Sequence, residues 1–366
     1  MRIAVNASIF DRRPSGLGVY ARALATALHA LHHDMVVYTS RPDEMPCART
    51  IWPWGEPSRG GPGHLWRMLW TQTVLPRWVR RDRAHVLLNP LAEGPTRAPV
   101  PQVSVIHDLI PLLYPEESPR QQWYLRSFIP AVLRASARVI ADSAQTKADV
   151  VAHYGLSPEG IVVIPPGVDH SQFFPRSDAG SEAKRLGLRA YILFVGNLRP
   201  HKNVARLLEA LVQVPDGLPL VVVGYRDPRY WPALARRAED LGIAGRVRFL
   251  GFVEAQRLPM LYAAALAVVV PSLYEGFGLP VLEAMACGVP VIASTAGALR
   301  EVAGDAALLV DPHDVSGWAE AITQVGADAV LRGDLRARGV IRAAQFSWSE
   351  TARRVLAVVA EVHAVR

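Results

Sequence analysis

The sequence predicts an α/β protein made of two doubly wound domains, each with a parallel sheet between layers of helices. The chain has 366 residues, which at ~150 residues per domain suits two cores better than one. Half of the residues are hydrophobic, so large cores are expected. Short apolar runs recur along the chain without alternating with polar residues. Such runs are typical of strands that are buried on both faces of a parallel sheet.

The apolar runs fall into two sets of six, and stretches of helical composition separate many of them. Alternation of strands and helices is typical of doubly wound α/β domains. The strands are expected at residues 3–6, 35–38, 85–88, 102–106, 138–141 and 161–164 in the first set, and at residues 191–195, 220–223, 246–250, 266–270, 290–293 and 307–310 in the second.

Proline and glycine interrupt the pattern between Pro165 and Ser181, where the interior of a helix or strand would not tolerate them. We therefore expect an N-terminal domain over residues 1–168, a linker over residues 169–188 and a C-terminal domain over residues 189–346. A last amphipathic helix begins after a capping serine, Ser347. Because this helix comes after the second set of strands is complete and does not follow a strand of its own, the residues alone allow it to pack on either domain.

The net charge, the cysteine content and the hydropathy of the chain limit the partners and the cellular location that we expect. The net charge of +7, of which residues 1–168 carry +5, allows a nucleic acid, an anionic membrane surface or a phosphorylated small molecule as partner. Two distant cysteines exclude a disulfide framework and favour the reducing cytoplasm. The N-terminus does not look like a secretory signal, and no apolar run reaches the ~18 residues of a membrane span. We expect a cytoplasmic protein, with a peripheral place at the inner face of the cell membrane as an option.

The strongest motif follows the run that ends at residue 270. Two glycines there permit a tight turn, and Pro280 suits the start of a helix, so the amides of residues 277–279 would lie at a helix N-terminus that favours anions. Glu275 on the turn and Glu283 in the helix would accept hydrogen bonds from sugar hydroxyls. Either carboxylate alone is better explained as a cap or surface residue, but together after a buried strand they indicate a ligand site.

A second motif follows the run that ends at residue 195. Gly196 begins a segment in which Arg199 and Lys202 precede a helix, and the chain has only two other lysines. An arginine fork and a lysine charge at a helix start suit a diphosphate. Two solvated basic residues are the alternative.

The first domain offers weaker signals. Gly16 and Gly18 formally satisfy a dinucleotide-binding pattern, but they lie beyond the turn after the first strand, and the second strand ends without an acidic residue for a ribose. We interpret them as a loop and helix start where backbone approaches a ligand, with an ordinary turn as the alternative. His107, before Asp108, and Ser143 follow the fourth and fifth strands, where ligands bind.

Tryptophan and arginine alternate over residues 65–83. This composition suits a membrane interface and equally a helix packed on the sheet. No nucleic-acid-binding module is recognisable, so we expect no nucleic acid as partner. The chain lacks an Asp-x-Asp motif and a His/Asp/Glu grouping of metal-site type, so we expect neither a metal nor another cofactor beyond a co-substrate.

Taken together, four features resemble the retaining GT-B glycosyltransferases of family 4: the Glu275-x7-Glu283 motif, the segment from Gly196 to Asn203, the Gly16-x-Gly18 pattern and His107-Asp108. The resemblance implies two Rossmann-like domains facing a central cleft. The acceptor would lie mostly on the N-terminal domain and a nucleotide diphosphate sugar mostly on the C-terminal one. The last helix, residues 347–366, would cross back to the N-terminal domain.

The resemblance also implies roles for the residues. Arg199 and Lys202 would bind the diphosphate and stabilise it as it leaves, Glu275 would hold hydroxyls of the transferred sugar, and His107 would lie beside the anomeric carbon; these four are the expected catalytic residues. Glu283 would hold the ribose. The full donor-binding set is expected to be Gly16, Gly18, Ser143, Gly196, Arg199, Lys202, Glu275, Gly276, Phe277, Gly278, Leu279 and Glu283.

The stretch from His107 to Glu116 is similar to that of bacterial enzymes that assemble O-antigen or exopolysaccharide. We therefore expect a retaining, metal-independent transferase that moves mannose from GDP-mannose onto a glycan or lipid-linked glycan. A nucleotide-sugar epimerase of the same two-domain shape is one alternative, although it would need its own acid and base carboxylates. A nucleotide-sugar sensor without catalysis is the other.

Overall fold

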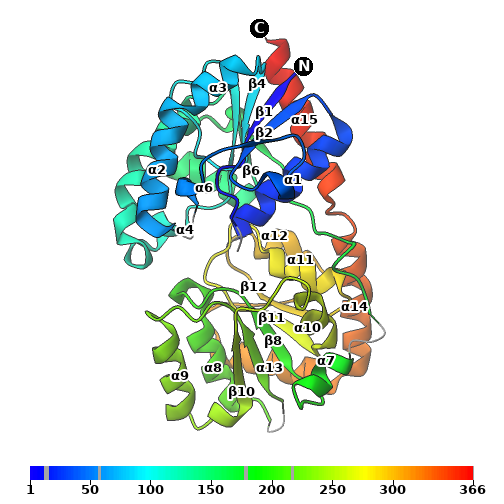
Figure 1. Ribbon diagram of the computed structural model, residues 1–366. Helices are drawn as coiled ribbons and strands as arrows, with labels where there is room; N and C mark the ends of the chain where they lie inside the picture. Colours follow the sequence, from blue (N-terminus) through cyan, green and yellow to red (C-terminus); the bar gives the residue numbers. More distant parts are fainter. Residues whose placement is uncertain (12–15, 57–58, 177–179, 216–217, 366) are drawn as a thin grey trace. The chain divides into compact units, whose positions relative to one another are not determined.

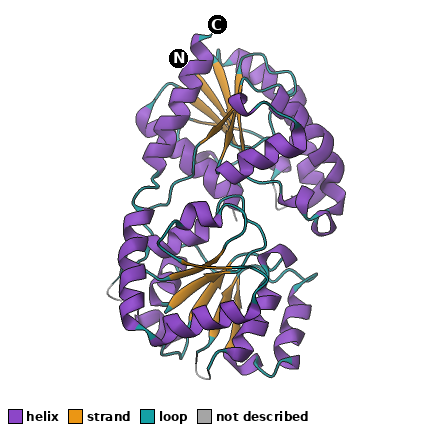
Figure 2. Cartoon of the chain, turned by 180° about the vertical axis from the view of Figure 1, so that it is seen from behind, coloured by secondary structure: helices purple, strands orange, loops and turns teal. Residues whose placement is uncertain are grey.

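The computed structural model describes residues 1–11, 16–56, 59–176, 180–215 and 218–365. The chain divides into two compact units (Figure 1). Unit 1 comprises Met1–Gly167 and Trp348–Arg366, and unit 2 comprises Val168–Ser347. Within each unit, helices cover both faces of a central sheet (Figure 2). This is the predicted architecture of two Rossmann-like α/β domains.

Unit 1 contains a parallel sheet with the strand order β3-β2-β1-β4-β5-β6-β7. The central strand β1 pairs with β2 on one side and with β4 on the other, so Ile3 lies opposite both Met35 and Val86. The order reverses direction between β1 and β4, which is where open α/β sheets place their ligands. The strands are β1 (Ile3–Asn6), β2 (Met35–Thr39), β3 (Ala48–Thr50), β4 (Val86–Asn89), β5 (Gln102–Ile106), β6 (Arg138–Ala141) and β7 (Ile161–Val163).

Helices on the two faces of this sheet bury its apolar side chains. On one face, α1 packs against the final helix α15, and Leu24 and Val359 are fully buried among strand residues. On the other face, Leu75 and Val79 of α3 are fully buried against β1, β2 and β4. The helices are α1 (Gly16–Leu31), α2 (Gly60–Thr73), α3 (Leu75–Arg81), α4 (Ile110–Leu113), α5 (Ile129–Arg134), α6 (Ala144–Tyr154) and α15 (Trp348–Ala364), with short helical turns that include Pro53–Gly55 and Tyr124–Phe128.

Unit 2 contains a second parallel sheet, with the order β10-β9-β8-β11-β12-β13. Here β8 pairs with β9 on one side and β11 on the other. The strands are β8 (Ile192–Val195), β9 (Leu220–Val223), β10 (Val247–Gly251), β11 (Ala267–Val270), β12 (Val291–Ser294) and β13 (Leu308–Val310).

The helices of unit 2 also form two layers. Side chains of α10, α11 and α12 pack in one core, and those of α8, α9 and α13 pack in the other around the fully buried Trp318. The helices are α7 (Gly180–Arg185), α8 (Val204–Gln213), α9 (Trp231–Asp240), α10 (Leu258–Ala264), α11 (Leu279–Ala286), α12 (Leu299–Ala303), α13 (Val315–Ala327) and α14 (Ala329–Ala343). Among the described residues, no helix has both the length and the hydropathy needed to cross a bilayer.

The expected linker over residues 169–188 is corrected by the structure, because this stretch belongs to unit 2. Its helix α7 packs against α10. Glu182 is buried there and accepts a hydrogen bond of 2.7 Å from Arg257 Nε, and Ala183 and Leu186 enter the core. Burial of these side chains makes the segment an integral part of the second unit.

The last helix crosses back to the first unit, as the resemblance implies. Helix α15 packs along α1, with Val355 and Val359 fully buried between the helix and the sheet. At its start, the Thr351 hydroxyl donates a hydrogen bond of 2.8 Å to the carbonyl of Pro165. The apolar stripe that the sequence shows after Ser347 therefore completes the core of unit 1.

Candidate functional site

The turn between β11 and α11 in unit 2 carries the strongest motif. Gly278 has φ of +111° directly before the helix, and a Cβ atom there would lie 2.7 Å from Leu299 Cδ2. Only glycine fits both the backbone and this contact. The Phe277 ring turns inward to the core and meets the edge of Phe346. Helix α11 then begins at Leu279, so its positive N-terminal end lies at the carboxyl end of the sheet, where an anion is favoured.

Glu275 is held at the start of this turn. Glu275 is buried, with 7% of its surface exposed, and its Oε1 accepts hydrogen bonds of 2.6 Å from Lys202 Nζ and 2.7 Å from the Ser272 hydroxyl. Its backbone lies against Gly297, where a Cβ atom would clash at 2.5 Å and where φ is +59°. The structure thus brings together Lys202 and Glu275, two residues that the sequence places 73 positions apart.

The residue after Lys202, Asn203, ties this segment to the ends of two strands of the sheet, β11 and β13. Asn203 has a left-handed backbone with φ of +61° at the start of α8. Its side-chain amide donates hydrogen bonds of 2.9 Å to the Pro271 carbonyl, after β11, and 2.7 Å to the Pro312 carbonyl, after β13. The sequence analysis gave this residue no role. Its place at the end of the Gly196 segment was the only signal.

Arg199 is partly exposed beside a cavity of about 220 Å³ that Asn203, Arg229 and Tyr230 also line. Arg229 forms a fork with Asp227, with contacts of 3.0 and 2.6 Å. The hydrogen bond from Arg229 is the main cause of a lowered pKa of Asp227, and the charge of Arg199 adds to it. Sequence reasoning missed Arg229, which follows the predicted strand at residues 220–223 closely enough to have been inspected.

Gly196 lies at the end of β8, where its amide donates a hydrogen bond of 2.9 Å to the Val223 carbonyl. A Cβ atom built on Gly224, which follows β9, would lie only 1.7 Å from the Gly196 carbonyl oxygen. The two strand ends therefore approach closely beneath the Arg199 segment.

Glu283 is partly buried one turn into α11. Its Oε2 accepts a hydrogen bond of 2.8 Å from the Tyr262 hydroxyl. Burial raises the pKa of Glu283 to about 7, although this hydrogen bond opposes the rise. Glu283 and Glu275 thus have different partners: a neutral phenol for one and a lysine for the other. A carboxyl group that titrates near neutrality can accept hydrogen bonds from hydroxyls once it is ionised.

In unit 1, His107 is the centre of a second polar cluster. Its Nδ1 lies 2.6 Å from Asp142 Oδ2, and its Nε2 lies 2.8 Å from the Pro90 carbonyl oxygen. Burial alone would lower the pKa of His107, but Asp142 and the Pro90 carbonyl raise it above its ordinary value. Both nitrogens face acceptors, and both contacts are hydrogen bonds only when each nitrogen carries a hydrogen. These two contacts therefore favour the protonated imidazolium.

His107 and Asp108 line a cavity of about 240 Å³ within unit 1. On its wall, the Glu93 carboxylate accepts hydrogen bonds of 3.1 Å from Arg67 Nη2 and 2.8 Å from the Tyr124 hydroxyl. Burial would raise the pKa of Glu93, but Arg67 and these neighbours lower it, so the carboxylate is ionised. Sequence reasoning missed Glu93 and Tyr124. Only the short distance of Glu93 from the strand at 85–88 could have drawn attention to it.

The remaining predicted donor-binding residues of unit 1 have local roles in this structure. Gly16 and Gly18 lie in the first turn of α1, in agreement with the expected helix start; residues 12–15 lie outside the described residues. The fully buried Ser143 caps α6, and its hydroxyl accepts a hydrogen bond of 3.0 Å from the Thr146 amide. Contact of these residues with a donor stays a prediction.

Within the described ranges, no three or more His, Cys, Asp or Glu side chains are grouped so as to hold a metal ion. Metal independence stays a prediction as well. In unit 2, the structure places cationic side chains beside the start of a helix. In unit 1, it places ion-paired side chains on the wall of a cavity.

Comparisons with known proteins match both halves of the chain. A family model described as Glycosyltransferase Family 4 matches residues 14–172, and one described as Glycosyl transferases group 1 matches residues 182–342. The chain is 35% identical over 258 residues to O-antigen chain mannosyltransferase B of Escherichia coli, across 67% of this chain and 66% of that protein. It is 38% identical over 243 residues to D-inositol 3-phosphate glycosyltransferase of Frankia alni, across 62% of this chain and 59% of that protein.

The chain thus spans about three fifths to two thirds of the length of these curated relatives. Among solved structures, sucrose-phosphate synthase from Thermosynechococcus elongatus superposes with a TM-score of 0.80 at 24% identity, over the full length of both chains. Anabaena HepE in complex with UDP-glucose also gives a TM-score of 0.80, at 21% identity, over 99% of this chain and all of that one. At these identities the likeness concerns the fold.

Proposed function

Because the chain belongs to the GT-B glycosyltransferases, with family 4 and group 1 domains, we propose that it is a retaining, metal-independent hexosyltransferase. It moves mannose from GDP-mannose onto a glycan or lipid-linked glycan in the synthesis of a surface polysaccharide such as lipopolysaccharide. The relative from E. coli, named as a mannosyltransferase, supports the choice of mannose. The fold neighbour in complex with UDP-glucose makes UDP the nucleotide that competes with GDP in this proposal.

The contact of 2.6 Å between Lys202 and Glu275 is the observation that carries this proposal. It places a cation and a hydroxyl acceptor side by side at the start of α11. Lys202 and Arg199 bind the donor diphosphate, and Glu275 accepts hydrogen bonds from the hydroxyls of the transferred sugar. The amides of Phe277 to Leu279 contact sugar and phosphate, and Glu283 accepts hydrogen bonds from the ribose hydroxyls.

The proposed reaction breaks the bond between the anomeric carbon and the diphosphate oxygen, and it forms a bond from that carbon to the acceptor oxygen on the same face. The acceptor proton passes to the departing diphosphate. Lys202 and Arg199 stabilise the charge that develops there. His107, assigned to the reacting sugar, acts in its protonated form as a cation, which the hydrogen-bond acceptors beside both ring nitrogens favour.

Replacement of Glu275 tests the proposal. Glu275→Ala is expected to abolish transfer, measured as product formed from a panel of nucleotide sugars and a lipid extract. The variant should keep its fold, shown by one cooperative thermal transition, although at a lower temperature because Lys202 loses its partner. Glu239→Ala, at an exposed glutamate of α9, is the matched control and should be fully active. Full turnover by Glu275→Ala would contradict the assignment.

The same product analysis separates the rival functions. Interconversion of two nucleotide sugars without any transfer would indicate an epimerase. Donor binding without turnover would indicate a sensor.

We also place the protein in the cytoplasm, peripheral at the inner face of the membrane, with residues 65–83 as the contact. This segment has five arginines and one aspartate, and Leu65, Trp66 and Leu69 are exposed on α2. Flotation with liposomes that contain anionic lipid tests this, and Arg80→Glu is expected to reduce the floated fraction. Unchanged flotation would make the segment a purely structural one.

A further inference from the structure

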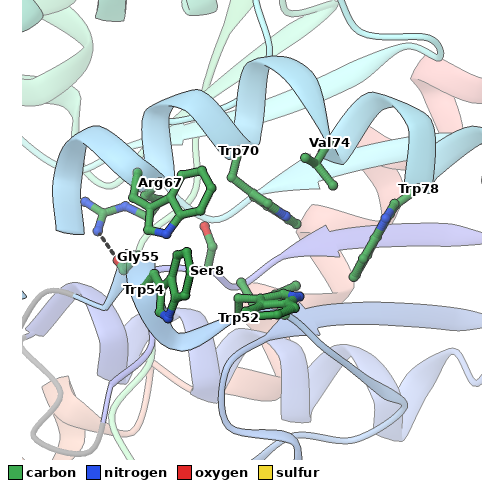
Figure 3. A pocket seen from close by; sticks show the side chains of 10 residues that line it. Ser8, Trp52, Trp54, Gly55, Arg67, Trp70, Val74 and Trp78 are labelled. Atoms are coloured by element: carbon green, nitrogen blue, oxygen red, sulfur yellow. Dashed lines mark hydrogen bonds between the residues drawn. The ribbon is translucent and has the colours of Figure 1, made fainter. Parts of the chain in front are cut away.

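A cavity of about 310 Å³ in unit 1, which we call the tryptophan pocket, is lined by five of the nine tryptophans in the chain. Figure 3 shows the rings on two sides. Trp70 and Trp78 extend from α2 and α3, and Trp52 faces them from the segment before the helical turn Pro53–Gly55. Trp54 lies in that turn and Trp66 on α2. The five rings thus come from two separate stretches of the chain.

The two sides differ in how they are supported. On the helix side, the buried Tyr38 ring holds Trp70 and Trp78 at centroid distances of 6.3 and 5.8 Å. On the other side, Trp52 is 68% exposed and Trp54 is 45% exposed. A ring system of this size ordinarily buries its surface, so the open side presents apolar area that a core would have covered. Exposed apolar area of this kind marks a binding site.

Two polar side chains on the wall, Ser8 and Arg67, already have partners. The Ser8 hydroxyl donates a hydrogen bond of 2.8 Å to Asn6 Oδ1. Arg67 Nη1 donates one of 2.9 Å to the Gly55 carbonyl, and its other nitrogens engage Glu93. What the pocket offers a ligand is therefore mainly ring surface. Aromatic and apolar walls with few polar groups suit a hydrocarbon rather than a hydroxyl-rich sugar.

Arg67 connects the tryptophan pocket to the polar cavity of unit 1, because it lines both. Its guanidinium faces Gly55 on the side of the first and Glu93 on the side of the second. The second cavity also contains His107 and Asp108. One molecule with an apolar chain and a polar head would match this pair of cavities.

We propose that the tryptophan pocket binds the hydrocarbon chain of a lipid-linked acceptor, whose polar head occupies the neighbouring cavity beside Glu93 and His107. The identification of this lipid as the acceptor rests on the proposed function. Binding of the hydrocarbon itself does not.

Titration of the full chain with n-alkyl glucosides tests the proposal, from methyl to octyl, each below its micelle-forming concentration and without donor. Isothermal calorimetry gives the affinity. Each methylene that enters the pocket is expected to tighten binding about fourfold, which corresponds to ~0.8 kcal/mol per buried CH₂. Trp52→Ala should weaken octyl glucoside at least tenfold. Trp123→Ala is the matched control, because this tryptophan is similarly exposed, at 65%, but lies outside the pocket.

Two results would overturn the proposal. Equal affinity for methyl and octyl glucoside would mean that the rings stack on sugar. Binding only to vesicles with anionic lipid, with Trp52→Ala and Trp123→Ala alike, would mean a membrane surface contact. Trp54→Ala serves as a second pocket variant, and thermal melting checks that each variant folds. Because no donor is present, the outcome is independent of glycosyl transfer, so failure here and failure of the transferase proposal are distinguishable.

Discussion

Each unit holds one tightly coupled ion pair that positions a predicted catalytic residue. Glu275 pairs with Lys202 in unit 2, and His107 pairs with Asp142 in unit 1, each at 2.6 Å. Buried charges cost desolvation free energy unless they are paired and hydrogen-bonded. Both pairs lie in segments that follow strands, where ligands bind in such sheets. The paired charges therefore point to side chains that are fixed for a ligand, at a cost in desolvation free energy.

His107 makes the stability of unit 1 depend on pH. Its pKa is raised in the folded protein, so the stabilising interaction is complete below the ordinary value of ~6.5 and is lost as pH rises through the raised pKa. The free energy of unfolding, measured with urea between pH 6 and 9, is expected to fall with pH in the wild type. It should fall less in His107→Gln. Parallel pH profiles for the two proteins would contradict a protonated His107.

Glu283 also makes stability fall as pH rises, but over a lower pH range than His107. Its pKa of about 7 in the folded protein exceeds the ordinary value of ~4.3, so ionisation destabilises the fold progressively between these two pH values. Glu283→Gln is expected to melt at a higher temperature than the wild type at pH 8 and at nearly the same temperature at pH 4.5. Tyr262 can donate its hydrogen bond to the glutamine oxygen, so packing is kept. A variant that is destabilised equally at both pH values would refute this prediction.

At the scale of elements, Asn203 joins the start of α8 to the ends of β11 and β13. Asn203→Ala removes two hydrogen bonds to buried carbonyls, at about 1–3 kcal/mol for a buried group left unsatisfied. It also strains a left-handed backbone by roughly 1–2 kcal/mol. We expect urea denaturation to show a loss of about 2–4 kcal/mol.

Asn203→Gly is the control for that experiment, because glycine keeps the left-handed backbone at no strain and lacks the amide. It should lose less stability than the alanine variant, and the difference measures the backbone contribution. Wild-type stability in both variants would show that the amide does not anchor α8.

The sequence predicts the elements where burial is continuous and misses them where it is not. All twelve apolar runs are strands, because a strand buried on both faces needs an unbroken apolar run. Strand β3 has only three residues, Ala48–Thr50, none of them buried, so it leaves no such pattern. The interpretation of residues 169–188 failed because the apolar residues of α7 are few and lie among turn-forming residues.

The candidate site was predictable only in part for a similar reason. Glu275 and Lys202 lie in motifs that directly follow predicted strands, so position alone indicated them. Glu93 becomes meaningful only through Arg67 and Tyr124, which are 26 and 31 residues away, and no spacing rule brings such residues together. The ring of tryptophans is likewise assembled from two stretches, of which the sequence analysis considered only residues 65–83.

At the scale of the whole molecule, the two units differ in charge. Unit 1 has 21 basic and 15 acidic residues, a net charge of +6, and unit 2 has 19 and 18, a net charge of +1. A surplus in the unit that holds the tryptophan pocket fits a partner with anionic groups, such as a lipid phosphate or an anionic membrane. In unit 2 the charges nearly balance, so the anion binding that we propose there would depend on the local placement of Arg199, Lys202 and the start of α11.

A diphosphate site in unit 2 predicts that nucleotides raise the melting temperature of this unit. A ligand at one hundred times its Kd stabilises the state that binds it by ~2.7 kcal/mol, and for a unit of this size ~1 kcal/mol raises Tm by roughly 2–4 °C. Saturating GDP is therefore expected to raise the melting temperature of unit 2 by about 5–10 °C, and UDP and ADP by less. Lys202→Ala should remove most of the shift, because the diphosphate loses its lysine. A larger shift with UDP than with GDP in the wild type would indicate that the donor is a UDP-sugar and not GDP-mannose. A shift that persists in Lys202→Ala would indicate that the diphosphate does not bind beside α11.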